Sequence, residues 1–309
     1  MFELHTSDFD PCPARAILRR EGKIDGVAGI ALFRGLLAHR ALELLHHEPD
    51  ELLSPIMTSA ASHVIDQLEH DGRMPSDAVM NKLAAIETEV TNVLDAYKRR
   101  IIPITNNWTL LGTEVPIYWE LSSDVHLSSH IDALFITKEG KPIVWDWKWR
   151  KDALAISDLS RNLQLACYFA TMVDGMVQLD ENALSHLEQN HTWEPPDGLS
   201  SDCWIYAPDG SPTPEVAWVD LPSLKPYTRK TVAQDDTGKE VAYIKGDDRP
   251  LSRAIRTIKH HPDQVEIIKK HALQRASIIQ NNVPMYIPQG CSHCECEAFC
   301  PRFDIPRDV

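Results

Sequence analysis

The chain has 309 residues and carries 31 Lys and Arg against 45 Asp and Glu, a formal net charge of −14. Hydrophobic residues make up 43% and charged residues 25%, the ordinary mix of a globular chain, which excludes collagen, coiled coil and wholesale disorder. The acidic balance also excludes a polycation that coats nucleic acid indiscriminately, but it admits an enzyme whose carboxylates hold a divalent metal. Because the sequence shows no apolar leader and no run of about 18 apolar residues, we expect no membrane association and an intracellular, cytoplasmic location.

The first predicted elements are helices. Residues 33–47 carry Leu and Ala at helical spacing, and residues 76–100 form a longer amphipathic pattern that begins with Ser76 as a plausible N-cap and ends in three cations. Three further helices are expected at 157–173, 248–260 and 263–280. Residues 245–275 hold eight Lys and Arg against four Asp and Glu, so positive charge is concentrated near the C-terminal end.

The middle of the chain changes to a strand pattern. Segments rich in β-branched and aromatic residues predict five strands, at 113–119, 130–137, 142–149, 202–207 and 214–220. Residues 138–141 indicate a hairpin turn between the second and third of these strands. Three irregular segments, 50–75, 175–200 and 225–245, are expected to be loops or insertions. Together these elements predict an α/β fold with a mixed sheet flanked by helices.

The most informative stretch is the strand that contains Asp146 and Lys148. Alternate side chains of a strand share a face, so Asp146 and Lys148 point the same way while Trp145, Trp147 and Trp149 pack on the other side. If the preceding strand pairs through the turn at 138–141, Asp132 can bring a second carboxylate to the same metal. Two carboxylates suit Mg²⁺ or Mn²⁺, and a neighbouring lysine can orient an attacking water as the ammonium or deprotonate it as the neutral amine, which is what phosphodiester hydrolysis requires.

Two helices supply further candidates for this site. His39 lies within the first helical pattern and could be a third metal ligand, although a single helix histidine is more often structural. Gln164 and Tyr168 are four residues apart and share one helix face, so that an amide and a phenol could reach a phosphate or a water together. The alternative for that helix is ordinary packing of Tyr168 in the core.

These residues, in this order, resemble the RecB-like branch of the PD-(D/E)XK nucleases. That branch has a helix His, a strand Glu, a Gly-x-x-Asp-like motif, a D-x-K motif and a Gln-x-x-x-Tyr helix. The matching positions are His39, Glu114, Asp132, Asp146 with Lys148, and Gln164 with Tyr168. One departure is that Ser128-Ser129-His130 replaces the small residue often found before the first Asp.

The resemblance implies a fold, an activity and roles for these residues. A restriction-endonuclease-like mixed sheet would form one unit of residues 1–309, with an N-terminal helical part (1–110), a nuclease core (111–222) and C-terminal helices with a cysteine cluster (245–309). Mn²⁺ or Mg²⁺ would be bound by His39, Asp132, Asp146 and the backbone carbonyl of Trp147, with Glu114 as a further ligand. Catalysis would fall to a set of five residues: Asp132, Asp146, Lys148, Gln164 and Tyr168.

Four of the seven cysteines crowd the C-terminal end, where Cys291, Cys294 and Cys300 supply three closely spaced thiolates. A tetrahedral metal site or a cubane cluster needs four, so one ligand must come from elsewhere. AddB-type helicase–nuclease subunits and small CRISPR-associated exonucleases have a split site of this kind with one upstream cysteine, and by that resemblance Cys12 completes a [4Fe-4S] cluster. Cys296 could replace one ligand, and Zn²⁺ remains the alternative ion.

The predicted activity is metal-dependent hydrolysis of DNA by an exonuclease that acts on single-stranded DNA or DNA ends. Recombination, repair and CRISPR adaptation are the processes, and the sources of partner proteins, that the resemblance implies. The alternative is a non-catalytic DNA-binding or assembly protein that keeps the nuclease fold and a structural Zn or Fe-S site. The intact set of Asp132, Asp146 and Lys148 argues against that alternative.

Overall fold

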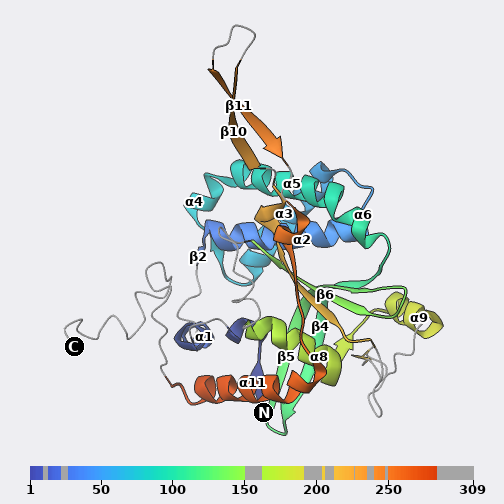
Figure 1. Cartoon of the computed structure of the whole chain (residues 1–309). Coiled ribbons are helices and arrows are strands. Elements are labelled where there is room, and N and C mark those ends of the chain that lie inside the picture. The colour runs from blue at the N-terminus through green and yellow to red at the C-terminus, as the bar shows by residue number, and fades with distance from the viewer. Residues whose placement is uncertain are drawn as a thin grey trace.

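A mixed β-sheet lies between two layers of helices, with α2, α3 and α5 on one side and α8 and α11 on the other (Figure 1). The computed structural model describes the residues 1–9, 13–21, 27–149, 162–190, 204–205, 212–225, 227–234, 240–247 and 250–283. The helices are α1 (Pro13–Arg20), α2 (Ile30–His47), α3 (Leu53–His70), α4 (Asp77–Met80), α5 (Leu83–Arg100), α6 (Ile102–Thr105), α8 (Leu163–Asp174), α9 (Glu181–Asn190), α10 (Leu251–Ala254) and α11 (Val265–Gln280).

The described part of the main sheet has eight strands. These are β1 (Phe2–Leu4), β4 (Thr109–Ser122), β5 (Val125–Ile136), β6 (Pro142–Lys148), β7 (Met176–Gln178), β8 (Trp204–Ile205), β9 (Glu215–Asp220) and β12 (Ile255–Ile258). Their order is β12-β9-β6-β5-β4-β7-β8, with β1 paired to β5. The pairs β6–β9 and β1–β5 are parallel and the others antiparallel, so the predicted mixed sheet is confirmed.

The hairpin between β5 and β6 forms as predicted. Lys141 and Thr137 close the turn through their backbones, and Gly140 has a φ of 80°, a conformation that glycine adopts without steric cost. The two strands then run antiparallel from Ile136↔Pro142 to Ala133↔Trp145. This short ladder positions the candidate catalytic residues, which follow directly where the pairing ends.

Each face of the sheet has its own hydrophobic core. On the α2 side, buried residues of β5 and β6 such as Phe135, Trp145 and Trp147 pack against α2, α3 and α5. On the α8 side, Val144 of β6 and Leu134 of β5 pack against α8 and α11. The period-2 alternation of β6 therefore separates the two layers, and the sidedness predicted for Trp145 and Trp147 is confirmed.

The predicted long helix over 76–100 is two helices. Ser76 caps the first of them, because its hydroxyl accepts a hydrogen bond from the backbone N–H of Val79 at 3.3 Å, as expected. The chain turns at Asn81 and Lys82 before α5 begins at Leu83. The predicted helix at 33–47 begins three residues earlier, at Ile30.

Three segments expected to be irregular contain regular structure. Residues 50–75 hold α3, whose Ile56, Ala60 and Val64 are buried, and Pro55 is tolerated because it lies in the first turn. Residues 175–200 contain β7 and α9, and the Asp180 carboxylate caps the latter by accepting a hydrogen bond from Ala183 N–H. Residues 225–245 contribute to an antiparallel hairpin of β10 (Tyr227–Gln234) and β11 (Glu240–Asp247), which extends away from the body of the molecule (Figure 1).

The predicted helix over 248–260 was wrong. Within the described residues 250–260, only α10 (Leu251–Ala254) is helical, and residues 255–258 form β12, which pairs with the edge of β9. Sheet pairing overrides a local helical pattern because it satisfies the backbone groups of both strands. The small pair β2 (Val27–Ala28) and β3 (Met74–Pro75) completes the described strands. Among the described helices, none has both the length and the apolar character needed to cross a bilayer.

Candidate active site

The candidate active site lies where β5 and β6 separate. Their pairing ends at Ala133↔Trp145, so Asp132 and Asp146 stand next to each other at the point of divergence. Beyond it, the backbone N–H of Trp147 has no strand partner on β5 and donates to Oδ2 of Asp132 at 2.5 Å. Asp132 therefore replaces a sheet hydrogen bond and is held in place by it.

His39 and Glu114 complete a group around Asp132. Nδ1 of His39 lies 3.7 Å from Oδ1 of Asp132 and 3.8 Å from Oε1 of Glu114. The possible ligand atoms of these three residues all lie within 4.8 Å of one another. Nε2 of His39 donates to the carbonyl oxygen of Trp147 at 2.8 Å, since a carbonyl can only accept. Nδ1 is thus the nitrogen that faces the carboxylates.

Asp146 follows the last paired residue of β6, next to Asp132, and is fully buried. Its Oδ1 accepts from Nζ of Lys148 at 2.6 Å and, more weakly, from Nε2 of Gln164 at 3.4 Å. The same Gln164 amide donates to the hydroxyl of Tyr168 at 3.0 Å. Asp146, Lys148, Gln164 and Tyr168 therefore form one hydrogen-bonded chain that joins β6 to α8.

The second carboxylate oxygen of Asp146 is the unusual atom of the site. Oδ2 is buried and has no hydrogen-bond partner among the described residues. Although Oδ1 pairs with Lys148, a buried carboxylate oxygen without a hydrogen bond is costly, so Oδ2 calls for a ligand that the protein itself does not supply. Carboxylates with one imidazole form a donor set that suits Mg²⁺ or Mn²⁺. The residues present therefore fit a divalent cation.

In the metal-free site, the charges of His39, Asp132 and Asp146 affect one another's pKa values. Burial raises the pKa of Asp132 to about 7, against the opposing effect of the nearby His39 and Lys148 charges. Burial would lower the pKa of His39, but the negative charges of Asp132 and Glu114 outweigh it and raise the pKa to about 9. Burial likewise raises the pKa of Asp146. Protonated His39 thus compensates for the carboxylates, and a divalent metal would replace that proton.

Lys148 keeps its charge despite burial. Desolvation alone would lower its pKa, but Asp146 and Asp132 outweigh this effect and hold the pKa above its usual range. Tyr168 stays neutral, because burial and the charges of Asp146 and Asp132 raise the pKa of its phenol. The site therefore offers an ammonium and a neutral phenol next to the carboxylates.

Glu114 has a strained backbone. Its φ is 47°, in the left-handed region that few non-glycine residues adopt. It stands opposite Asp132, between the pairs Thr113↔Ala133 and Val115↔Ile131. Such conformations cost about 1–3 kcal/mol and are concentrated at functional sites. The strain lies at a residue whose carboxylate faces His39.

The structure brings together every nuclease-motif residue singled out from the sequence: His39, Glu114, Asp132, Asp146, Trp147, Lys148, Gln164 and Tyr168. Thr6 was missed. It lies in a 3-10 turn, Thr6–Phe9, where its hydroxyl bonds to Ser129 and lies 3.5 Å from the hydroxyl of Tyr168. No local pattern marks Thr6, because only the tertiary fold brings the N-terminus beside α8.

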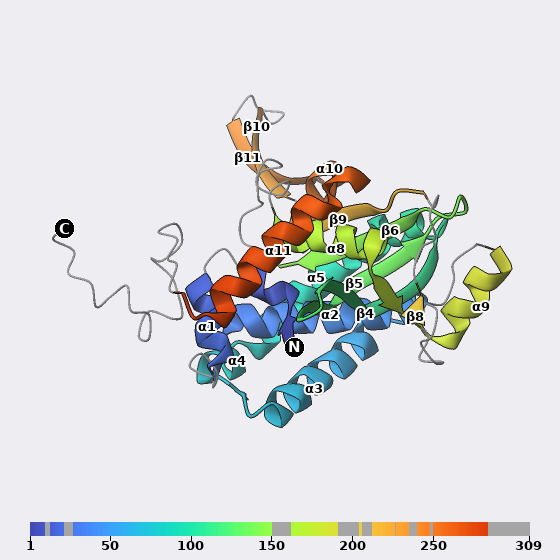
Figure 2. The ribbon, with the colours of Figure 1, turned by 90° about the horizontal axis from the view of Figure 1, so that it is seen from below.

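The predicted cluster ligands Cys12, Cys291, Cys294 and Cys300, and the possible substitute Cys296, lie outside the described residues. The segments next to them do approach each other, since α1 packs against α11 (Figure 2). Nδ2 of Asn282, just after α11, is 3.4 Å from Oε1 of Glu21, just after α1. Cys167 is buried in α8, as expected for a small core residue.

Comparison with known proteins agrees with this geometry. The family model of the PD-(D/E)XK nuclease superfamily matches residues 5–301, nearly the whole chain. No curated protein matches the sequence. The match spans the divergent strands β5 and β6 that carry Asp132, Asp146 and Lys148, together with the helices that carry His39 and Gln164. The chain belongs to the PD-(D/E)XK nuclease superfamily.

Proposed function

We propose that this protein is a metal-dependent DNA exonuclease that hydrolyses phosphodiester bonds of single-stranded DNA or of DNA ends. Membership of the superfamily supports a metal-dependent nuclease and DNA as the substrate. The observation that carries the proposal is the buried, unpartnered Oδ2 of Asp146, a residue that stands next to Asp132 where β5 and β6 diverge and that binds Lys148 through Oδ1. The order of the motifs, which resembles that of RecB-like nucleases, supports action on ends.

We assign the metal to Nδ1 of His39 and to carboxylate oxygens of Glu114, Asp132 and Asp146, and the carbonyl of Trp147 remains a predicted ligand. When bound, Mn²⁺ or Mg²⁺ supplies charge stabilisation at the phosphate and acidifies a water. The hydrogen bond from Trp147 N–H holds the Asp132 carboxylate in place. The bond from His39 Nε2 to the Trp147 carbonyl orients the imidazole in the same way.

Lys148 acts as the cation of the reaction. Because its pKa lies above the usual range, the ammonium stays protonated at neutral pH in the metal-free protein. We therefore assign it to orienting the attacking water and offsetting negative charge that develops on the phosphate. Gln164 and Tyr168 position Asp146 and Lys148 through their hydrogen-bonded chain, and they offer an amide and a phenol to the substrate.

We also propose that Cys12, Cys291, Cys294 and Cys300 hold a [4Fe-4S] cluster. The contact between α1 and α11 supports this arrangement, because it brings the chain that follows Cys12 beside the helix that precedes the cysteine group. Anaerobic protein should then be brown and lose its visible absorbance in Cys291→Ser. A colourless protein with one equivalent of zinc would favour the alternative ion. An intracellular role in recombination, repair or CRISPR adaptation fits both centres.

The test of the nuclease proposal is degradation of end-labelled single-stranded DNA in Mn²⁺. Wild type should release label from a free end, and blocking that end should stop release if the enzyme is an exonuclease. Lys148→Met should lower the rate by about 100-fold or more. Lys269→Met is the matched control, because Lys269 lies on α11 near Asp174, away from the site. Equal rates of release in wild type and Lys148→Met would overturn the role of Lys148. No release of label by wild type would leave the non-catalytic DNA-binding alternative.

A further inference from the structure

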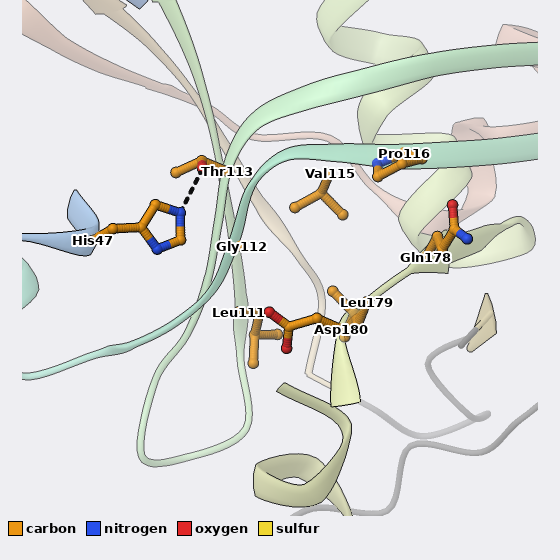
Figure 3. A pocket seen from close by; sticks show the side chains of 9 residues that line it. All are labelled: His47, Leu111, Gly112, Thr113, Val115, Pro116, Gln178, Leu179 and Asp180. Carbon is orange, nitrogen blue, oxygen red and sulfur yellow. Dashed lines mark hydrogen bonds between the residues drawn. The ribbon is translucent and has the colours of Figure 1, made fainter. Parts of the chain in front are cut away.

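A cavity of about 480 Å³ lies beside the metal group, between the end of α2, the first half of β4 and the segment that joins β7 to α9 (Figure 3). Its volume falls within the roughly 300–1,000 Å³ range of small-ligand sites. Four of its lining residues are polar: His47, Thr113, Gln178 and Asp180. The proposed hydrolysis does not use any of them.

The cavity and the metal group share two elements. Thr113 and Val115 line the cavity, and Glu114 between them turns its carboxylate toward His39 and Asp132. At Glu114, whose backbone is left-handed, β4 therefore contributes residues both to the cavity and to the metal group. On α2, His47 follows His39 by eight residues, about 12 Å along the helix axis. A strand whose phosphate lies at the metal group can therefore reach the cavity with a nearby nucleotide.

The lining matches a nucleobase. The partly exposed Pro116 and the edges of the buried Leu111, Val115 and Leu179 provide apolar surface, which suits the flat faces of a base. His47 and Gln178 lie on opposite sides of the cavity and can offer an aromatic ring and an amide (Figure 3). The ring of His47 is held by a hydrogen bond of 3.1 Å between its Nε2 and Oγ1 of Thr113. It is therefore preorganised for contact with a ligand.

The charges favour a base over a phosphate. Among the described residues that line the cavity none is Lys or Arg, and Asp180 is acidic. The carboxylate of Asp180 would repel a phosphate group, and the carboxylate of Glu114, on the strand β4 that lines the cavity, adds negative charge nearby. A neutral base with donor groups along its edge can donate to Oδ2 of Asp180, since Oδ1 already accepts from Ala183 N–H.

We propose that this cavity binds the base of a nucleotide in the strand being cut, within a few nucleotides of the scissile phosphate. The inference rests on the proposed nuclease function and adds a subsite to it. The base enters between His47 and Gln178, with its faces against the apolar walls and its edge toward Gln178 and Asp180. The site then requires a base that is unpaired, which favours single-stranded substrates and frayed ends.

The test is an abasic scan. A labelled single-stranded oligonucleotide carries one abasic nucleotide at successive positions from its end, and its affinity is measured with Ca²⁺ in place of Mn²⁺ to slow hydrolysis. In wild type, one position should weaken binding about tenfold when its base is removed, which is within the range for one stacked base. His47→Ala should weaken binding of the intact oligonucleotide by a similar factor, with no further loss at that position.

Two variants control this experiment. His63→Ala removes an exposed histidine of α3 and should retain the wild-type scan. Thr113→Val keeps the side-chain volume but frees the His47 ring, so an intermediate loss at the same position is expected. An abasic penalty that is identical in wild type and His47→Ala, with both folded by circular dichroism, would overturn the subsite. If wild type degrades no DNA in Mn²⁺, the proposed nuclease function fails instead.

Discussion

Replacing Asp132 by Asn tests whether this buried carboxylate, a proposed metal ligand, lowers the stability of the metal-free protein. Asp132 is buried, and burial raises its pKa from 3.8 to about 7. Because the folded carboxyl holds its proton more tightly than the unfolded one, stability falls as pH rises from about 4 to 7 and stays lowered above 7. A shift of about three pKa units corresponds to about 4 kcal/mol. This figure already includes the attraction of His39 and Lys148, and it is an upper bound because the surroundings of a buried charge relax, so we expect a penalty of about 1–3 kcal/mol.

Asn has the same shape and can still accept the hydrogen bond from Trp147 N–H. We therefore expect metal-free Asp132→Asn at pH 8 to be about 1–3 kcal/mol more stable than wild type. This corresponds to a rise in Tm of about 2–4 °C per kcal/mol. Mn²⁺ at 100 times its Kd should stabilise wild type by about 2.7 kcal/mol and should not stabilise the variant. Thermal melts at pH 8 in EDTA and in MnCl2 measure both effects.

Asp8→Asn is the matched control. Asp8 is equally buried, but its carboxylate pairs with Arg20 and accepts from His5 N–H. Neutralising it breaks a satisfied pair, so this variant should lose stability and keep the Mn²⁺ response. The reasoning is refuted if Asp132→Asn melts below wild type in EDTA. It is also refuted if Mn²⁺ raises the Tm of Asp132→Asn as much as that of wild type.

Three further predictions concern neighbouring residues. Burial lowers the pKa of His46 to about 4. Below pH 6.5 the unfolded chain therefore binds a proton that the folded protein does not, which should lower the free energy of unfolding by about 3 kcal/mol at pH 4. His46→Gln should reduce this pH dependence of stability in urea titrations. Trp147→Ala removes a buried ring stacked on His46 and should lower stability by about 3–5 kcal/mol in the same titrations, whereas the partly exposed Trp149→Ala should lose less. To bind metal, His39 must lose a proton that it holds with a pKa of about 9. The Mn²⁺ affinity measured by calorimetry should therefore rise about tenfold per pH unit from pH 7 to 9. An affinity that does not change with pH would contradict the assignment of His39 as a metal ligand.

The face of β6 on which each side chain lies could be predicted from the sequence, because it depends only on local alternation along the strand. Side chains alternate along β6, so the sequence itself places Asp146 and Lys148 on one face and Trp145 and Trp147 on the other. The turn at 138–141 brings the preceding strand back beside β6. A period of two residues and one tight turn therefore predicted the central hairpin.

Elements that depend on distant partners were harder to predict. Residues 255–258 carry a helical pattern, yet they form β12 because the edge of β9 is available. The hairpin of β10 and β11 was missed because its strands pair with each other across residues that show no clear period. In both cases the secondary structure depends on the strand with which the segment pairs, and the local sequence pattern does not show which strand that is.

The sequence by itself determined the family, the order of the motif residues and the identity of the charged groups. Only the tertiary structure decided how they act together. The divergence of β5 from β6 frees Trp147 N–H for Asp132 and leaves Oδ2 of Asp146 unpartnered. His39 reaches the Trp147 carbonyl, 108 residues away in the chain, because α2 packs across the sheet. The physical reason is that burial and charge coupling are properties of neighbours in space, which the order of residues does not specify.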